Sequence, residues 1–385
     1  MSRGIEDSKI YQYLASLTHD PESSAIVEYK TTGGKVIGCL YNQVPDELIT
    51  AAGMLAYRPR AVGSQGDELA EVRFTQVNCS LVRNFYDSAK RGRFDFMDGL
   101  VVANSCDHVR KLYENWKDAI GLPYGYLICF PKRNGDAQVD ELAKRLKVFK
   151  RDFENHFSVE IDDASLRAAI ELHNKIRLQQ QELSELRALP EPKLTGSQFM
   201  NVMIAGTCMQ RDKYSELLSD LIEECKEAPG ISSGRARVII YGGEIDEVGL
   251  LEAIESQGAL IVGDSLGSFG TRAFDYQVST EGDLLHNLAK ALLQDRQGEP
   301  RIYGTREGRS ERVKQIMEDC KAQGVIQVHI PICDLWSYER MMFDVFADNN
   351  SLPFHDLVTE YVFAAAGQTK TRVQAFVETL TEGGR

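Results

Sequence analysis

Short apolar runs alternate along this chain with longer segments of helical spacing. In the first half, apolar runs at residues 35–40, 99–103 and 124–130 are typical of buried strands. Between them, residues 81–92 place Leu81, Phe85 and Ala89 on one face, and residues 107–116 also carry apolar positions at helical spacing. Strands that alternate with amphipathic helices predict a parallel sheet covered by helices.

The same alternation returns in the second half. Strands are predicted at 201–205, 237–241, 259–262, 324–330 and 353–359, and an amphipathic helix at 367–380. Two long helices are predicted between the halves, at 136–189, before the linker 191–197. We therefore predict an α/β protein with two facing, doubly wound parallel-sheet domains of Rossmann or flavodoxin type. The expected division is an N-terminal helical segment (1–34), a first α/β domain (35–135), a helical insertion with linker (136–196) and a second α/β domain (197–385).

Composition excludes several classes of function. Of the 385 residues, 43% are hydrophobic and 26% are charged, and no run approaches the roughly 18 apolar residues of a membrane span. The first residues mix both charges without an apolar core, so we expect a cytoplasmic protein. The net charge of −13 argues against a nucleic-acid partner.

Candidate chemistry centres on cysteines at the starts of predicted helices. Cys106 lies between a predicted strand and a helix, and Cys79 also precedes a helix. The pair Cys333-Asp334 repeats Cys106-Asp107 in the second half. Because ligands bind beyond the carboxyl ends of parallel strands, two facing units would bring Cys106 and Cys333 into one cleft, where Cys79 could join them.

The residues alone leave the role of these cysteines open. The eight cysteines are dispersed and show no CxxC spacing, which argues against disulfides and zinc ribbons. Unrelated buried cysteines, a zinc site and an iron-sulfur cluster all stay possible, and a redox pair needs only two thiols. His108, His329 and Cys208 are candidates for a fourth zinc ligand. The glycine-rich stretch 263–270 lacks a nucleotide-binding fingerprint, so a plain connection between strand and loop is the favoured interpretation.

Four stretches carry a family resemblance: VNCSLVRNFYDSA, DGLVVANSCDHVRKLYENW, GVIQVHIPICDLWSYE and the terminal GQTKTR. With these the chain resembles the 2-hydroxyacyl-CoA dehydratase and benzoyl-CoA reductase family over residues 30–382. Within the family it looks most like the smaller of the two cluster-bearing subunits of ATP-dependent benzoyl-CoA reductase.

The resemblance implies one [4Fe-4S] cluster bound by Cys79, Cys106 and Cys333, with the fourth iron site not filled by cysteine. It also implies a larger homologous subunit with its own cluster, a separate ATP-hydrolysing activator, ferredoxin upstream and a CoA-thioester substrate. Low-potential electrons would reduce an aromatic CoA thioester to a cyclic dienoyl-CoA. His108 and His329 are candidate proton donors because each lies close in sequence to a cluster cysteine.

Three other functions stay open. The chain could belong to a 2-hydroxyacyl-CoA dehydratase, which uses a ketyl radical and recycles its electron. It could be an electron-relay or scaffold subunit without a substrate site. A zinc-stabilised α/β binding module is the third alternative.

Overall fold

The two predicted sheets are present in the computed structural model, which describes residues 4–232, 234–363 and 366–382. The first sheet has the order β2-β1-β3-β4 and the second β6-β5-β7-β8, and all neighbouring strands are parallel. The strands are β1 (Val36–Leu40), β2 (Leu55–Tyr57), β3 (Gly99–Ala103), β4 (Gly125–Ile128), β5 (Ala236–Gly242), β6 (Ala259–Ser265), β7 (Gly324–His329) and β8 (Phe354–Val358). This arrangement confirms the predicted α/β class with two parallel sheets.

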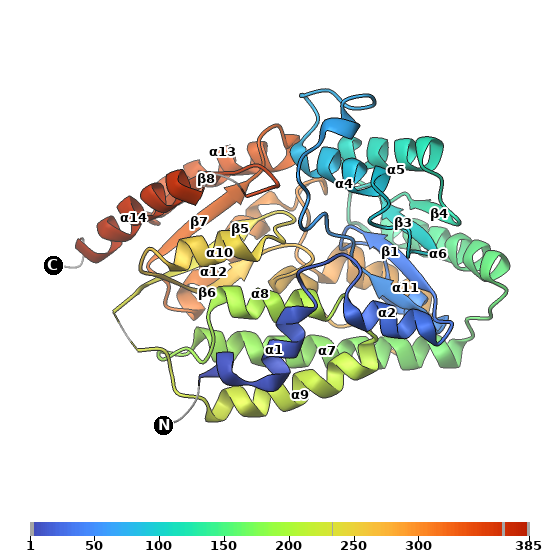
Figure 1. The fold of residues 1–385 in the computed structure, drawn as a ribbon, viewed down its shortest axis with the longest axis horizontal. Coiled ribbons are helices and arrows are strands. Elements are labelled where there is room, and N and C mark those ends of the chain that lie inside the picture. Colours follow the sequence, from blue (N-terminus) through green and yellow to red (C-terminus); the bar gives the residue numbers. More distant parts are fainter. Residues whose placement is uncertain (1–3, 233, 364–365, 383–385) are drawn as a thin grey trace.

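Helices flank both sheets (Figure 1). The first half and the region between the sheets contain α1 (Lys9–Ser16), α2 (Ser24–Thr31), α3 (Asp46–Ala51), α4 (Ser80–Lys90), α5 (Asp107–Ala119), α6 (Asp136–Phe157), α7 (Asp163–Ala188), α8 (Gly196–Ala205) and α9 (Arg211–Glu227). The second half contains α10 (Val248–Glu255), α11 (Leu284–Lys290), α12 (Arg306–Asp319), α13 (Asp334–Asn349) and α14 (Ala366–Glu382). The long helices α6 and α7 contact elements of both halves: α7 packs on α3 and η3 (Thr271–Ala273), and α6 packs on β4 and α11.

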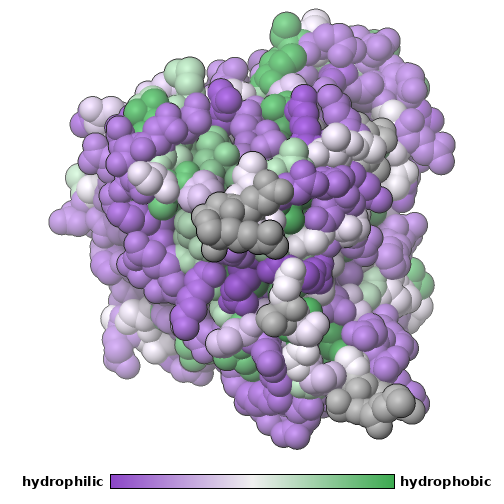
Figure 2. All heavy atoms as spheres, turned by 90° about the vertical axis from the view of Figure 1, so that its left-hand side faces the viewer, coloured by the Kyte–Doolittle hydropathy of each residue, from purple (hydrophilic) through white to green (hydrophobic). Residues whose placement is uncertain are grey.

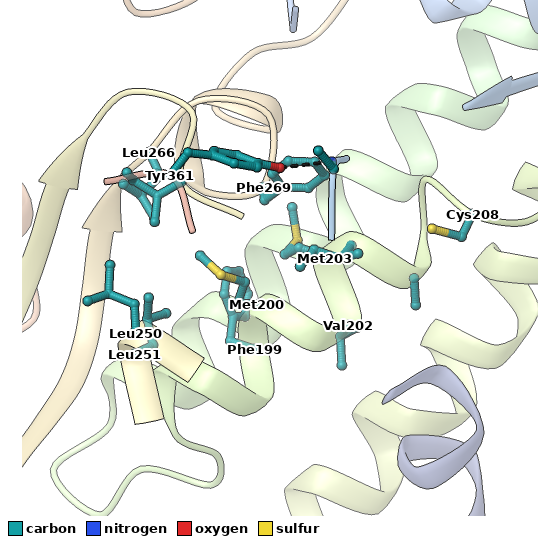
Figure 3. Packing of buried hydrophobic residues seen from close by; sticks show 14 of the residues in the cluster. Phe199, Met200, Val202, Met203, Cys208, Leu250, Leu251, Leu266, Phe269 and Tyr361 are labelled. Carbon is teal, nitrogen blue, oxygen red and sulfur yellow. Dashed lines mark hydrogen bonds between the residues drawn. The ribbon is translucent and has the colours of Figure 1, made fainter. Parts of the chain in front are cut away.

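One predicted strand is wrong. Residues 201–205 belong to helix α8, which begins with a capping box between Thr195 and Gln198. The helix is buried along nearly its whole length, so its apolar residues do not show the one-sided pattern of a surface helix. A short apolar run of this kind cannot be assigned by periodicity alone, and the capping box was the available signal. Figure 3 shows Phe199, Met200 and Met203 of α8 within this core.

A buried ionic cluster joins the two halves. The Glu299 carboxylate accepts hydrogen bonds from Asn42 Nδ2 at 3.2 Å and from the Tyr41 hydroxyl at 3.4 Å, and both residues directly follow β1. From its own half, Arg272 and Arg296 approach the same carboxylate at 3.4 and 3.6 Å. The Asn42, Glu299, Arg272 and Arg296 side chains are all buried. The cluster therefore ties the carboxyl end of β1 to the second half of the chain.

The surface differs from this interior. The face toward which both ends of the chain point is covered mainly by hydrophilic residues, with scattered apolar ones (Figure 2). Among the described residues, no helix is both long and apolar enough to cross a membrane.

Candidate functional site

Three cysteines predicted from the sequence occupy the same position in three helices. Cys79 is the N-cap of α4, Cys106 of α5 and Cys333 of α13. An N-cap residue directs its side chain toward the free backbone N–H groups of the first helical turn. The Val109 N–H accordingly donates to Cys106 Sγ at 3.4 Å. Such a position favours negative charge on sulfur, because the N-terminus of a helix carries partial positive charge.

All three side chains line one cavity of about 90 Å³, called here the sulfur cavity. Its wall comes from the carboxyl ends of β1, β5 and β7 and from the starts of α4, α5 and α13, so both sheets contribute. In the first sheet β2 lies on one side of β1 and β3 lies on the other, so the direction of the strand order reverses between β1 and β3. The second sheet reverses in the same way between β5 and β7. The ends of these strands are therefore the topological switch points of the two sheets. The predicted meeting of the two halves at one cleft is therefore present.

The thiols are close enough to influence one another. Burial, together with the nearby Cys333 and Cys106 sulfurs, raises the pKa of Cys79 to about 12. Burial likewise raises the pKa of Cys333 to about 11 and raises that of Cys106. All three are free cysteines. Without a bound cation the cavity thus favours three neutral thiols.

The backbone before Cys333 has an unusual conformation. Ile332 has φ 61°, in the left-handed region that β-branched residues rarely adopt. Such a conformation costs on the order of 1–3 kcal/mol and persists where the surroundings impose it. Here it turns the chain after β7 so that Cys333 reaches the N-cap of α13.

Three thiols fit a thiolate-bound metal centre by donor type, since thiolates are the usual ligands of iron-sulfur clusters and of structural zinc. The backbone N–H groups at each N-cap add a means of stabilising bound sulfur. Within residues 4–232, 234–363 and 366–382, however, no group of three or more His, Cys, Asp or Glu side chains is arranged to hold a metal ion. The residues therefore match the expected ligand set in chemistry and orientation without forming a ready-made cage.

The two candidate histidines lie in different places. His329, at the end of β7, lines the sulfur cavity, and its Nδ1 is 3.1 Å from Asp356 Oδ1. His108 is not among the lining residues; its Nδ1 accepts a hydrogen bond from the Cys79 N–H at 3.3 Å. His108 thus holds the backbone of Cys79, while only His329 reaches the cavity. Their roles as proton donors stay predictions.

Cys208, a candidate for a fourth ligand, is buried in the core and is not among the residues lining the sulfur cavity. Figure 3 shows it beyond the end of α8. It is bonded locally, with its sulfur 3.8 Å from the Thr207 hydroxyl. We find no structural support for Cys208 as a ligand.

Sequence reasoning missed several residues of the cavity wall. Cys39 in β1 lines the cavity beside the three other cysteines. Tyr41 and Arg58 also line it, as does Glu244, which closely follows β5. Position could have indicated two of them, because Tyr41 follows β1 and Glu244 follows β5, the strands at the two switch points.

Comparison with known proteins gives the family. Residues 41–380 match the family described as 2-hydroxyglutaryl-CoA dehydratase, D-component. The chain belongs to this family. The resemblance found in the cysteine stretches is therefore confirmed, and the chain is a subunit of the 2-hydroxyacyl-CoA dehydratase and benzoyl-CoA reductase type.

Individual relatives include both enzyme types. The chain is 24% identical to the (R)-phenyllactyl-CoA dehydratase beta subunit of Clostridium sporogenes, over 97% of this chain and 99% of the relative. It is 24% identical to the beta subunit of (R)-2-hydroxyglutaryl-CoA dehydratase from Acidaminococcus fermentans, over 92% and 95%. It is 27% identical to a benzoyl-CoA reductase subunit from Thauera aromatica, over 83% and 84%.

Proposed function

We propose that this chain is the iron-sulfur subunit of an ATP-dependent benzoyl-CoA reductase, which helps transfer low-potential electrons to an aromatic CoA thioester. The observation that carries the proposal is the convergence of Cys79, Cys106 and Cys333 on one cavity in a chain of this family. These three residues would hold a [4Fe-4S] cluster whose fourth iron site is not filled by cysteine. A bound cluster would supply one-electron chemistry at the cavity.

The chain's own residues have two tasks in this proposal. The N-cap positions place the three sulfurs at helix starts, where the Val109 N–H already donates to Cys106 Sγ. The apolar side chains of Phe85, Phe269 and Trp336 line the cavity and exclude water. A cavity of about 90 Å³ is far smaller than the several hundred Å³ of a site for a whole large ligand, so most of a CoA thioester would have to lie outside it.

The proposed complex has further members. Relatives that are named as beta subunits, or as one subunit of a reductase, point to a homologous partner subunit. A separate ATP-hydrolysing activator fed by ferredoxin would deliver the electrons, as the family resemblance implies.

The first test is iron and sulfide analysis after anaerobic purification. Wild-type protein should hold about four irons and four sulfides per chain, the composition of the cluster. Cys79→Ala, Cys106→Ala and Cys333→Ala should each lower both contents strongly. Cys39→Ala is the matched control, because Cys39 also lines the cavity but its sulfur lies 3.6 Å from the Ile37 carbonyl oxygen, within its own strand. Wild-type protein that is free of iron and loaded with zinc would overturn the proposal in favour of a zinc-stabilised module.

A role in a 2-hydroxyacyl-CoA dehydratase is the second candidate, favoured by the larger share of the chain that matches the dehydratase beta subunits. Turnover in the assembled complex separates the two. ATP consumed with every product indicates the reductase, whereas one activation that supports many turnovers indicates the dehydratase. Retained CoA-thioester binding by the partner alone would instead favour a relay or scaffold role for this chain.

A further inference from the structure

Glu244 is an acid in the wall of the sulfur cavity that has no ionic partner within 4 Å among the described residues. Its Oε2 accepts a hydrogen bond from the Ser268 N–H at 3.1 Å. The other carboxyl group of the wall, Asp246, differs: its Oδ2 lies 3.5 Å from Arg60 Nε and accepts a hydrogen bond from the Tyr361 hydroxyl at 2.9 Å. Glu244 is thus the wall carboxyl that is not committed to a charge pair.

The neighbouring loop is shaped around the Glu244 carboxyl. A Cβ atom added at Gly267 would lie 2.2 Å from Glu244 Oε1, so any larger residue would displace the carboxyl group. The Gly267 N–H also donates to the Gly243 carbonyl oxygen at 3.0 Å, which fixes the loop against the chain just before Glu244. The sequence suggested no specific role for the glycine-rich stretch 263–270. Gly267 of this stretch leaves the space that the Glu244 carboxyl group occupies.

The charges around Glu244 favour its neutral form. Burial is the main cause that raises the pKa of Glu244, and the nearby Glu299 carboxylate raises it further. Arg272 and the Ser268 hydrogen bonds oppose the shift without cancelling it. Arg58 also borders the cavity, but its guanidinium binds Asp46 at 2.9 Å. The other titratable groups of the wall are Asp246, His329, the four cysteine thiols and the Tyr41 hydroxyl, and the Tyr41 hydroxyl donates to Glu299.

A second pocket could resupply a proton. It has a volume of about 70 Å³, enough for water, and it shares Arg58 and Ser268 with the sulfur cavity. Charged and polar side chains line it, among them Asp46, His173, Arg177 and Arg211. The buried Ser268 side chain therefore stands between Glu244 and a polar, water-sized space.

We propose that Glu244 is the proton donor of the sulfur cavity and acts on the acyl end of a reduced CoA thioester. The inference rests on the proposed function. In the step, the carboxylic O–H bond of Glu244 breaks, a new bond to hydrogen forms on the reduced acyl group, and a carboxylate remains. No electron moves in this step. The carboxylate regains its proton from water in the second pocket through Ser268.

Infrared difference spectra of the metal-free protein test the protonated state directly. Glu244→Gln keeps the shape of the neutral acid, and its spectrum should lack one carboxylic-acid C=O band that wild type retains above the ordinary Glu pKa of about 4.3. Glu252→Gln on α10, where Glu252 is exposed, is the matched control and should remove no such band. Loss of no band in Glu244→Gln would overturn the proposal.

Turnover of the reconstituted complex tests the role in the reaction. Glu244→Gln should retain wild-type iron content and lower turnover by about 10²-fold or more, as expected for loss of a general acid. Glu244→Asp, which keeps an acid, should restore part of the rate. Unchanged turnover in Glu244→Gln would refute the role as donor, whereas iron-free wild-type protein would refute the proposed function itself.

Discussion

Replacing Glu299 by glutamine should destabilise the whole chain, because it removes the carboxylate that holds Arg272 and Arg296 together. Both guanidinium groups are buried, and each also lacks a partner for its Nε atom among the described residues. Breaking a buried ion pair by removing one partner typically costs about 3–5 kcal/mol, since the other charge stays buried and unpaired. Glutamine keeps the size and can still accept from Asn42, so the loss reflects charge rather than packing.

Equilibrium urea unfolding measures this loss, and thermal unfolding provides a second readout. At roughly 2 °C per kcal/mol for a large domain, the midpoint should fall by about 6 °C or more. Glu281→Gln is the control, because Glu281 is exposed and should change stability by less than about 0.5 kcal/mol. A Glu299→Gln protein whose stability differs from wild type by less than about 1 kcal/mol would show that the two arginines find other partners, and the reasoning would fail.

The cluster also predicts a pH dependence. Burial alone would raise the pKa of Glu299, but the Arg272 and Arg296 charges outweigh it and the pKa lies below its ordinary value. A lowered pKa contributes stability that is present above the unfolded value of 4.5 and is lost as pH falls through the folded value. The difference in unfolding free energy between wild type and Glu299→Gln should therefore disappear as the pH falls through the folded pKa of Glu299.

Three further outcomes can be measured, two by urea unfolding and one by iron analysis. Burial raises the pKa of Asp275 to about 6 from 3.8, so wild-type stability should fall as pH rises between these values, and Asp275→Asn should remove that slope in urea unfolding. Burial lowers the pKa of His173 to about 4 from 6.5, so stability should fall as pH drops through this range; His173→Gln should flatten the curve, and an unchanged curve would contradict it. Cys208→Ala should keep the wild-type iron content, because Cys208 does not line the sulfur cavity, and iron loss would make Cys208 a ligand after all.

Much of the fold could be predicted because strand and helix periods differ. The apolar runs that became β1, β3 and β7 are short and bounded by turn residues, and the repeated Cys-Asp pair indicated two similar halves. The prediction failed at α8, where the apolar residues cover a helix that is buried on nearly every side. Because α8 is buried on nearly every side, its apolar residues show no helical periodicity. Only the capping box distinguishes a helix from a strand at this segment.

The site was predictable only in part. Cys106 and Cys333 could be paired because the same local sequence follows a strand in each half. Glu244 could not be found in this way, since its importance depends on the missing ionic partner and on the space beside Gly267. Both are properties of packing between segments, which local sequence does not encode.

The division of the sulfur cavity between the two halves sets an order of events during synthesis. Cys79 and Cys106 leave the ribosome long before Cys333, and domains generally fold as units from the N-terminus. The third thiol therefore becomes available only after strands β1–β7 have been made. Loading of any shared prosthetic group must then be a late event, and a truncated product that ends before α13 would be unable to retain it.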